Sequence, residues 1–139
     1  MRPFKYEVSL RVTHPDMPAE RICRAVPLEP NYAATKGDKR IVPSGIERGI
    51  QPATVCLFSL GDAVSSDEGV VDFLRRFNRK LGGCRDLLRE IRSTGGEIRY
   101  FIGWYSAGNT GEEFELAFLQ ECVDLGIEFG IDFYDSGMK

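Results

Sequence analysis

Hydrophobic and polar residues alternate along three stretches of the chain. Between Phe4 and Thr13 every second residue is apolar, and the same period of two recurs over 98–104 and 127–133. This period is typical of a strand with one buried face. Such strands favour an antiparallel or mixed sheet, because parallel sheets are covered on both faces. The run Val55–Leu60 is largely apolar on both faces, which predicts a strand near the centre of the sheet.

Helical periodicity fills the intervals between these strands. Asp16 is expected to cap a short helix that turns Ile22 and Val26 inward. Ser65 and Glu68 have the spacing of a capping box ahead of a helix over 70–81, which Gly82 and Gly83 should end by adopting a left-handed conformation. Further helices are predicted over 84–94 and 113–125. The inward residues expected in the last one are Leu116, Phe118, Leu119, Cys122 and Leu125.

The order of these elements predicts an α+β fold. We expect a single domain over residues 1–139, with a mixed or mainly antiparallel sheet of four to five strands and helices packed on one face. The stretch 27–52 is rich in proline and glycine, and a connection of this length is uncommon without internal order. An additional edge strand is therefore expected over 40–42.

Composition excludes several classes of protein. The net charge of −3 argues against general attraction to nucleic acid, and no apolar run is long enough to cross a membrane. The four cysteines are far apart in the sequence, which is not typical of a disulfide framework or a zinc site. We expect them to be reduced core residues, and the amino-terminal residues lack the pattern of a secretory signal. A cytoplasmic location is predicted.

Several short motifs carry a family resemblance. They are the opening strand with 16–26 after it, the segment 30–38 ending in Lys-Gly-Asp, Ser66 leading into 70–81, and Leu125-Gly126 followed by Ile-Asp-Phe-Tyr at 131–134. In this order they resemble the bacterial family known as domain of unknown function 4279. The chain departs from the family pattern at two places. A Trp is common in the second strand of the family, where this chain has 55–58, and a His is common in the next helix, where this chain has Phe73. The resemblance implies no reaction, only an association with small bacterial proteins, some of them toxin-immunity or defence-linked.

The single histidine is the main candidate for catalysis. His14 and Asp16 follow the first strand, and an imidazole beside a carboxylate can transfer protons near neutral pH. The alternative is structural, with Asp16 as a helix cap and His14 as an exposed turn residue. We favour the structural interpretation, because no nucleophile or metal accompanies the pair. No catalytic residue is therefore assigned, and we lean against an enzyme.

Two further patterns are weighed as ligand sites. The glycine-rich stretch 103–111 has neither a Walker nor a dinucleotide-binding spacing, and Glu112 and Glu113 suit the start of the last helix better than a phosphate site. A simple turn is expected there, with a neutral or cationic ligand as the alternative. Glu128 and Asp132 are too far apart along a strand to share one ion, and Asp135 has the opposite parity. We therefore expect no metal site and no cofactor.

Charge is unevenly distributed along the sequence. Basic residues outnumber acidic ones over 75–92, whereas 112–139 is strongly acidic. No aromatic residue is interleaved among the later arginines to stack bases, so nucleic acid is not the expected partner. The simplest interpretation of these basic residues is that they form solvent-exposed faces of two helices. The alternative is a protein partner held by charge complementarity, at Arg75, Arg76, Arg79, Arg85, Arg89 and Arg92.

Two classes of function remain. The first, which we favour, is a non-catalytic protein-interaction module, with an immunity or defence role as one possibility that the resemblance raises. The alternative is a small-ligand-binding protein or enzyme with a pocket between the 27–52 and 103–111 loops. Homodimerisation through an edge strand is compatible with either class.

Overall fold

Strand β1 (Phe4–His14) forms the middle of the main sheet in the computed structural model, which describes residues 4–41, 44–64 and 68–135. It pairs antiparallel with β5 (Thr54–Val64) on one side and β6 (Glu97–Ser106) on the other. The short β2 (Tyr32–Ala34) extends the sheet beyond β5, and β7 (Ile127–Asp135) runs parallel to β6 at the other end. The predicted mixed sheet is confirmed, but its central strand is β1 and not the 55–60 run.

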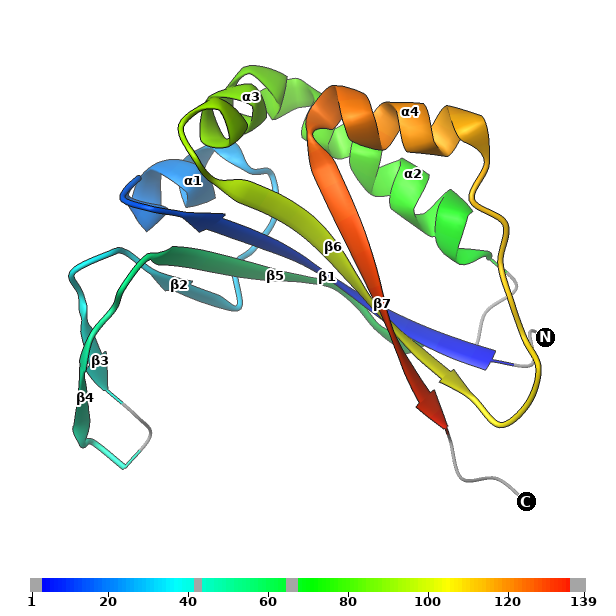
Figure 1. Ribbon diagram of the computed structural model, residues 1–139, viewed down its shortest axis with the longest axis horizontal. Helices are drawn as coiled ribbons and strands as arrows, with labels where there is room; N and C mark the ends of the chain where they lie inside the picture. Colours follow the sequence, from blue (N-terminus) through cyan, green and yellow to red (C-terminus); the bar gives the residue numbers. More distant parts are fainter. Residues whose placement is uncertain (1–3, 42–43, 65–67, 136–139) are drawn as a thin grey trace.

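The helices lie over one face of this sheet, as predicted (Figure 1). They are α1 (Ala19–Ala25), α2 (Val70–Leu81), α3 (Arg85–Ser93) and α4 (Leu116–Leu125), and the 3-10 turn η1 (Gly82–Cys84) joins α2 to α3. Each helix from α2 onward turns an apolar stripe toward the sheet, in agreement with the helical period in the sequence. The α+β class is therefore confirmed.

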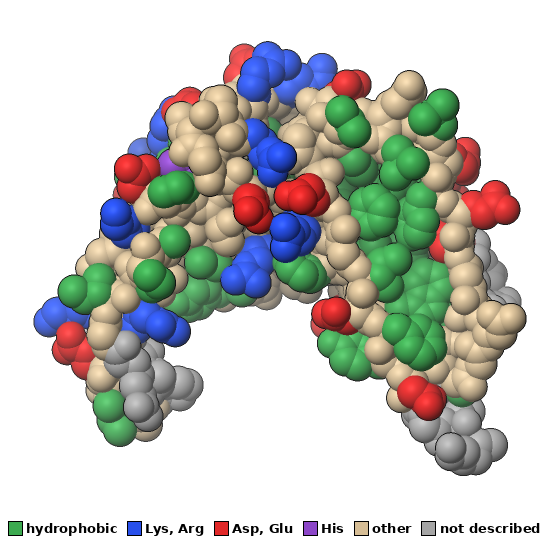
Figure 2. Space-filling model, in the orientation of Figure 1, with side chains coloured by type: hydrophobic (Ala, Val, Ile, Leu, Met, Phe, Trp, Pro, Cys, Tyr) green, Lys and Arg blue, Asp and Glu red, His purple; other side chains and the backbone are tan. Residues whose placement is uncertain are grey.

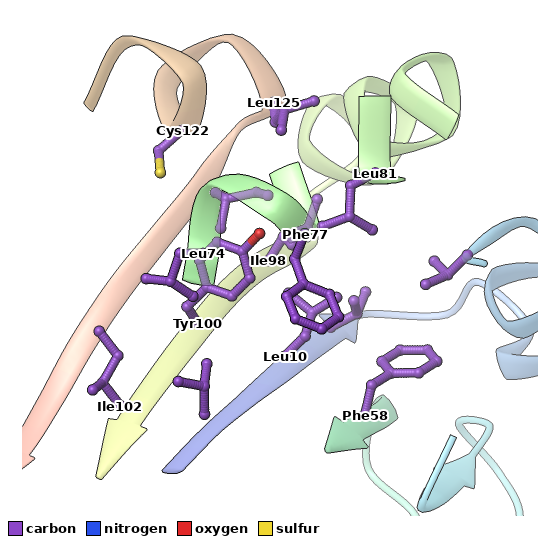
Figure 3. Packing of buried hydrophobic residues seen from close by; sticks show 14 of the residues in the cluster. Leu10, Phe58, Leu74, Phe77, Leu81, Ile98, Tyr100, Ile102, Cys122 and Leu125 are labelled. Carbon is purple, nitrogen blue, oxygen red and sulfur yellow. The ribbon is translucent and has the colours of Figure 1, made fainter. Parts of the chain in front are cut away.

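The core lies between this helical layer and the sheet. Leu10 of β1 and Tyr100 of β6 point toward Leu74 and Phe77 of α2, and all four are buried (Figure 3). Burial of one such side chain contributes about 1.5–3 kcal/mol. Because β1 and β6 alternate strictly, their inward apolar residues all contribute to this core, and only the last residue of each strand, His14 and Ser106, is a buried polar one.

Three helix ends differ from the sequence-based prediction. α1 begins after Pro18 without a side-chain cap, so Asp16 is not its cap. Gly82 keeps a right-handed conformation with φ −56°, and the chain continues through η1 instead of stopping there. α2 begins at Val70 with Gly69 as its N-cap and without a side-chain cap, so the predicted Ser65–Glu68 capping box does not start it; Ser65 itself lies outside the described residues. By contrast, α4 does end at Gly126, which has the left-handed φ of 73° that favours glycine.

The 27–52 connection contains more order than the sequence indicated. Besides β2, it holds β3 (Lys39–Ile41) and β4 (Glu47–Ile50), which pair only with each other and project from one end of the sheet (Figure 1). Arg40 is therefore in a strand, as expected, but in a separate two-stranded sheet. Val42 lies outside the described residues.

The cysteines contribute to the core as small apolar residues. Cys56 and Cys122 are buried, and Cys23 and Cys84 are half-buried against the same cluster. Burial, with Cys23 alongside, raises the pKa of Cys56 to about 12, and burial raises the pKa of Cys122 to about 11. These thiols are poor nucleophiles, because the thiolate is the reactive form. Among the described residues, no helix has the length and apolar character needed to cross a membrane.

Candidate interaction surface

The arginines predicted to bind a partner lie on α2 and α3, where carboxylates of the same chain hold three of them. Arg75 makes two hydrogen bonds to Glu121 of α4, at 2.9 and 2.6 Å. Arg76 forms a bidentate pair with Glu68, and its guanidinium carbon lies 5.1 Å from the ring centre of Phe73. Arg92 reaches Glu128 of β7 at 3.3 Å. Arg75 and Arg92 therefore link α2 to α4 and α3 to β7, and Arg76 holds the segment that precedes α2.

The remaining three arginines are more exposed to solvent. Arg89 is 3.9 Å from Asp86 on the same helix, a distance at which an exposed pair contributes little. Arg79 and Arg85 are exposed beside Glu121 and Asp124. The six arginines thus do not form one continuous cationic surface, because acidic side chains lie between them.

A buried polar network links the sheet to two helices. The Tyr100 hydroxyl donates to Oδ1 of Asn78 at 2.6 Å, and Nδ2 of Asn78 donates to Glu121 at 3.0 Å. Burial opposes ionisation of Glu121, but the hydrogen bonds from Arg75 and Asn78 outweigh it and hold the pKa of that carboxyl below its usual range. Burial raises the pKa of Tyr100 far above its usual value. The network is structural, since every member is engaged within it.

His14 is buried at the end of β1, so the prediction of an exposed turn residue is wrong. Its Nδ1 accepts hydrogen bonds from the backbone N–H groups of Asp16 and Met17, at 3.0 and 2.8 Å. Its Nε2 lies 2.7 Å from the Thr94 hydroxyl, which itself donates to the carbonyl oxygen of Glu90. Both ring nitrogens are therefore used, and the ring is the neutral tautomer with its proton on Nε2. No nitrogen is left for a substrate.

The glycine-rich 103–111 stretch is not a loop throughout. Its first four residues belong to β6, and the turn after them is closed by its own side chains. Trp104 donates to the Thr110 hydroxyl at 2.9 Å, and that hydroxyl donates to Ser106. Glu112 does not serve the start of α4, because its carboxylate accepts from the backbone N–H of Val71 in α2, at 3.4 Å. The polar groups of this turn therefore serve the fold.

The acidic residues of β7 do not form a metal site. Glu128 contacts both Arg92 and Arg99, at 3.3 and 3.6 Å. Within the described ranges, no group of three or more histidine, cysteine, aspartate or glutamate residues is arranged to hold an ion.

The outer edge of β7 is the most exposed apolar part of the sheet. β7 is last in the strand order, and none of the described strands pairs with its outer edge. Ile131 and Phe133 are 45% and 60% exposed, beside the stacked rings of Phe114 and Phe129. Hydrophobic side chains gather along β7 below α4 in Figure 2. We call Phe114, Phe129, Ile131, Phe133 and the outer backbone edge of β7 from Ile127 to Tyr134 the edge surface.

The sequence placed these β7 residues in the core. Their alternation correctly predicted a strand, but Ile131 and Phe133 are exposed because α4 covers only the first part of β7. Leu116, also expected inward, is 71% exposed at the start of α4. One sequence signal could have indicated this exposure. The alternating segment follows the last predicted helix, so no later helix is available to cover it.

The face of the sheet opposite the helices is concave. In Figure 2 the molecule forms an arch between the β3–β4 hairpin and the far ends of β6 and β7. A hollow of about 430 Å³ lies on this face, and we call it the open-face hollow. Asn31 from the 27–52 segment and Gly103 and Tyr105 from the 103–111 segment line it, but strands separate them. The pocket predicted between two loops is thus a hollow on a sheet.

Two stacked tyrosines form the β7 side of this hollow. Tyr105 and Tyr134 are paired across β6 and β7, with ring centres 4.8 Å apart and planes 13° from parallel. The Tyr105 hydroxyl is 3.3 Å from Glu7, and burial together with Glu7 raises its pKa. Gly103 leaves room for this ring, since a Cβ there would lie 3.3 Å from it. Asp132 lines the hollow beside the stack.

No family model, curated protein or solved structure matches this chain.

Proposed function

We propose that the chain is a non-catalytic protein-interaction module that takes up an extended segment of a partner protein along the edge surface. The observation that carries this proposal is an edge strand, β7, whose outer side is paired with none of the described strands and which carries exposed apolar side chains. β7 pairs with β6 in regular register, so the backbone donors and acceptors along its other edge, from Ile127 to Tyr134, face away from β6. Such an edge is a template for strand addition.

Apolar exposure next to this edge supports the same function. Ile131 and Phe133 share the helix-side face of β7, where alternate side chains of an added strand would pack. Exposed apolar patches on a folded domain mark interaction sites more often than isolated exposed residues do. Catalysis at His14, weighed in the sequence analysis, has no free ring nitrogen to use.

Charge favours a different protein over a second copy as the occupant. The segment 112–139 is strongly acidic, and Asp132 lies on β7 itself. Two copies paired through β7 would bring like charges together, which disfavours a dimer. The resemblance to the domain of unknown function 4279 family stays a prediction, and a toxin-like partner would agree with it. We also place the protein in the cytoplasm, since its buried thiols suit a reducing compartment.

Purification from the native host tests this proposal. Tagged full-length chain is compared with the variants Phe133→Asp and Ile131→Asp, and co-purifying proteins are identified by mass spectrometry. The matched control is Val123→Asp, because Val123 is 77% exposed on α4 and the same apolar-to-acidic change is made there. We expect a stoichiometric partner with wild type and with Val123→Asp, and its loss with both β7 variants.

A second variant separates this proposal from the basic interface predicted from sequence. Arg85→Glu/Arg89→Glu reverses two exposed charges on α3 that, among the described residues, make no short ion pair with another element. Partner loss with that variant alone would overturn the edge surface and favour the arginines. A retained small molecule with no protein would favour the ligand-binding alternative, for which the open-face hollow is the candidate site.

A further inference from the structure

The tyrosine stack on the open face ends at Tyr134, beyond which no described strand continues it. Tyr105 and Tyr134 are register partners, and their ring spacing of 4.8 Å matches the spacing of neighbouring strands. The rings therefore stack in the direction in which strands are added. Tyr134 is 46% exposed, and no described strand lies beyond it. A side chain opposite Tyr134 on an added strand would become the third layer of this stack.

The stack is held in place before any partner arrives. The Tyr105 ring lies over Gly103, and its hydroxyl lies 3.3 Å from the Glu7 carboxylate of β1. Tyr134 rests on that ring at an interplanar angle of 13°. A pre-organised aromatic face loses little conformational entropy on binding, so more of the contact energy becomes affinity.

The charge beside the stack selects the third layer. Asp132 is two residues before Tyr134 on the same face of β7, and it lines the open-face hollow. In the described part of the chain, no cation forms an ion pair with Asp132. Diagonal positions on adjacent strands are about 7–8 Å apart, which a long side chain spans. Arginine combines a planar cation that stacks on aromatic rings with a fork that binds carboxylates.

We propose that the partner segment carries an arginine that stacks on the outer face of Tyr134 and pairs with Asp132. This inference rests on the strand addition proposed above, and it names the chemistry of the added strand. The segment has apolar residues at alternate positions, which contact Ile131 and Phe133 on the helix side. The arginine occupies an intervening position, on the side of the open-face hollow.

Peptide selection on the full-length chain tests the arginine. A displayed library of random nine-residue peptides is selected on wild type, with counter-selection on Phe133→Asp. We expect enriched sequences with alternating apolar residues and an arginine between two of them. The most enriched peptide is then labelled and titrated by fluorescence anisotropy, beside a version with citrulline, which keeps the planar shape without the charge. Citrulline should weaken binding about fivefold.

Variants of the chain assign the effect to the two proposed contacts. Asp132→Asn and Tyr134→Leu should each weaken the arginine peptide about threefold to fivefold and leave the citrulline peptide less affected. Tyr134→Phe keeps the ring and should keep the affinity. Asp124→Asn, which removes an exposed carboxylate from α4, is the charge-matched control and should change nothing.

The outcomes separate this inference from the proposed function. Enriched peptides without a basic residue, or equal affinity for citrulline, would overturn the arginine and leave strand addition intact. No enrichment over the Phe133→Asp bait would overturn both. A stable dimer of the chain in light scattering, lost in Phe133→Asp, would make a second copy the occupant and overturn the arginine-bearing partner.

Discussion

At the scale of single residues, His14, the main candidate for catalysis in the sequence, has a structural role. His14 connects the end of β1 to the turn that starts α1 and, through Thr94, to the end of α3. The sequence indicates only its type and its neighbours Pro15 and Asp16. Its burial could not be predicted from them, because Thr94 is 80 residues away along the chain.

Replacing this ring should therefore destabilise the fold. His14→Ala leaves the N–H groups of Asp16 and Met17 without their acceptor and opens a cavity, so we expect a loss of about 3 kcal/mol in the free energy of unfolding. Urea denaturation followed by circular dichroism measures it. The control Asp16→Ala removes an exposed side chain and should stay within about 0.5 kcal/mol.

The Asp16→Ala control distinguishes a structural role of the His14 ring from one in which the Asp16 carboxylate orients it. If Asp16→Ala lowers the free energy of unfolding as much as His14→Ala does, the carboxylate orients the ring, and the structural role assigned to the backbone hydrogen bonds of His14 is wrong. A double variant with Thr94→Ala gives a further check. Its loss should be smaller than the sum of the two single losses, since both remove the same contact.

At the scale of elements, local patterns predicted the strands and helices, but contacts between elements decided what they do. β1 and β6 alternate because one of their faces is covered, and α2 repeats every third or fourth residue for the same reason. The sequence could not show that β7 is only partly covered, because strand order is a long-range property. It also showed the charge of Arg75 but not its partner Glu121, which is 46 residues away.

The polar network between β6, α2 and α4 is an element-level contact that a conservative change can test. Tyr100→Phe keeps the ring in the core but leaves Oδ1 of Asn78 buried without its donor. We expect a loss of about 1–2 kcal/mol in the free energy of unfolding. Thermal and urea denaturation measure it, and Tyr32→Phe, at an exposed position, is the matched control. Equal stability of Tyr100→Phe and wild type would show that the hydroxyl contributes nothing to this packing.

At the scale of the whole molecule, part of the charge separation along the sequence is neutralised within the fold. The basic helices α2 and α3 hold acidic residues of α4 and β7, through Arg75 to Glu121 and Arg92 to Glu128. The acidic charge that has no such partner includes Asp132, next to the edge surface. The uneven charge distribution suggested a basic interface in the sequence. In the structure, the exposed charge beside the edge surface is acidic.

This arrangement predicts how stability depends on pH. The pKa values of Glu121, Glu68 and Glu90 lie below the ordinary value of 4.5. At Glu121, burial raises the pKa, but the hydrogen bonds from Arg75 and Asn78 outweigh it. At Glu68 and Glu90 the largest cause is an arginine hydrogen bond, from Arg76 and Arg21 respectively. Below 4.5 the unfolded chain binds protons that the folded chain does not, so each group stabilises the fold above that pH and loses its contribution as pH falls through its folded pKa. We expect the free energy of unfolding to fall steadily from pH 5 to pH 3.

Urea denaturation at successive pH values measures this slope, and Glu121→Gln isolates one contribution to it. Glutamine keeps an acceptor for Arg75 and Asn78 but does not titrate, so the variant should be less stable than wild type at pH 7 and should converge with it near pH 3. Glu29→Gln, which removes an exposed carboxylate, is the control and should follow wild type throughout. A constant difference between Glu121→Gln and wild type across the range would mean that the Arg75–Glu121 pair does not link α2 to α4 through its charge.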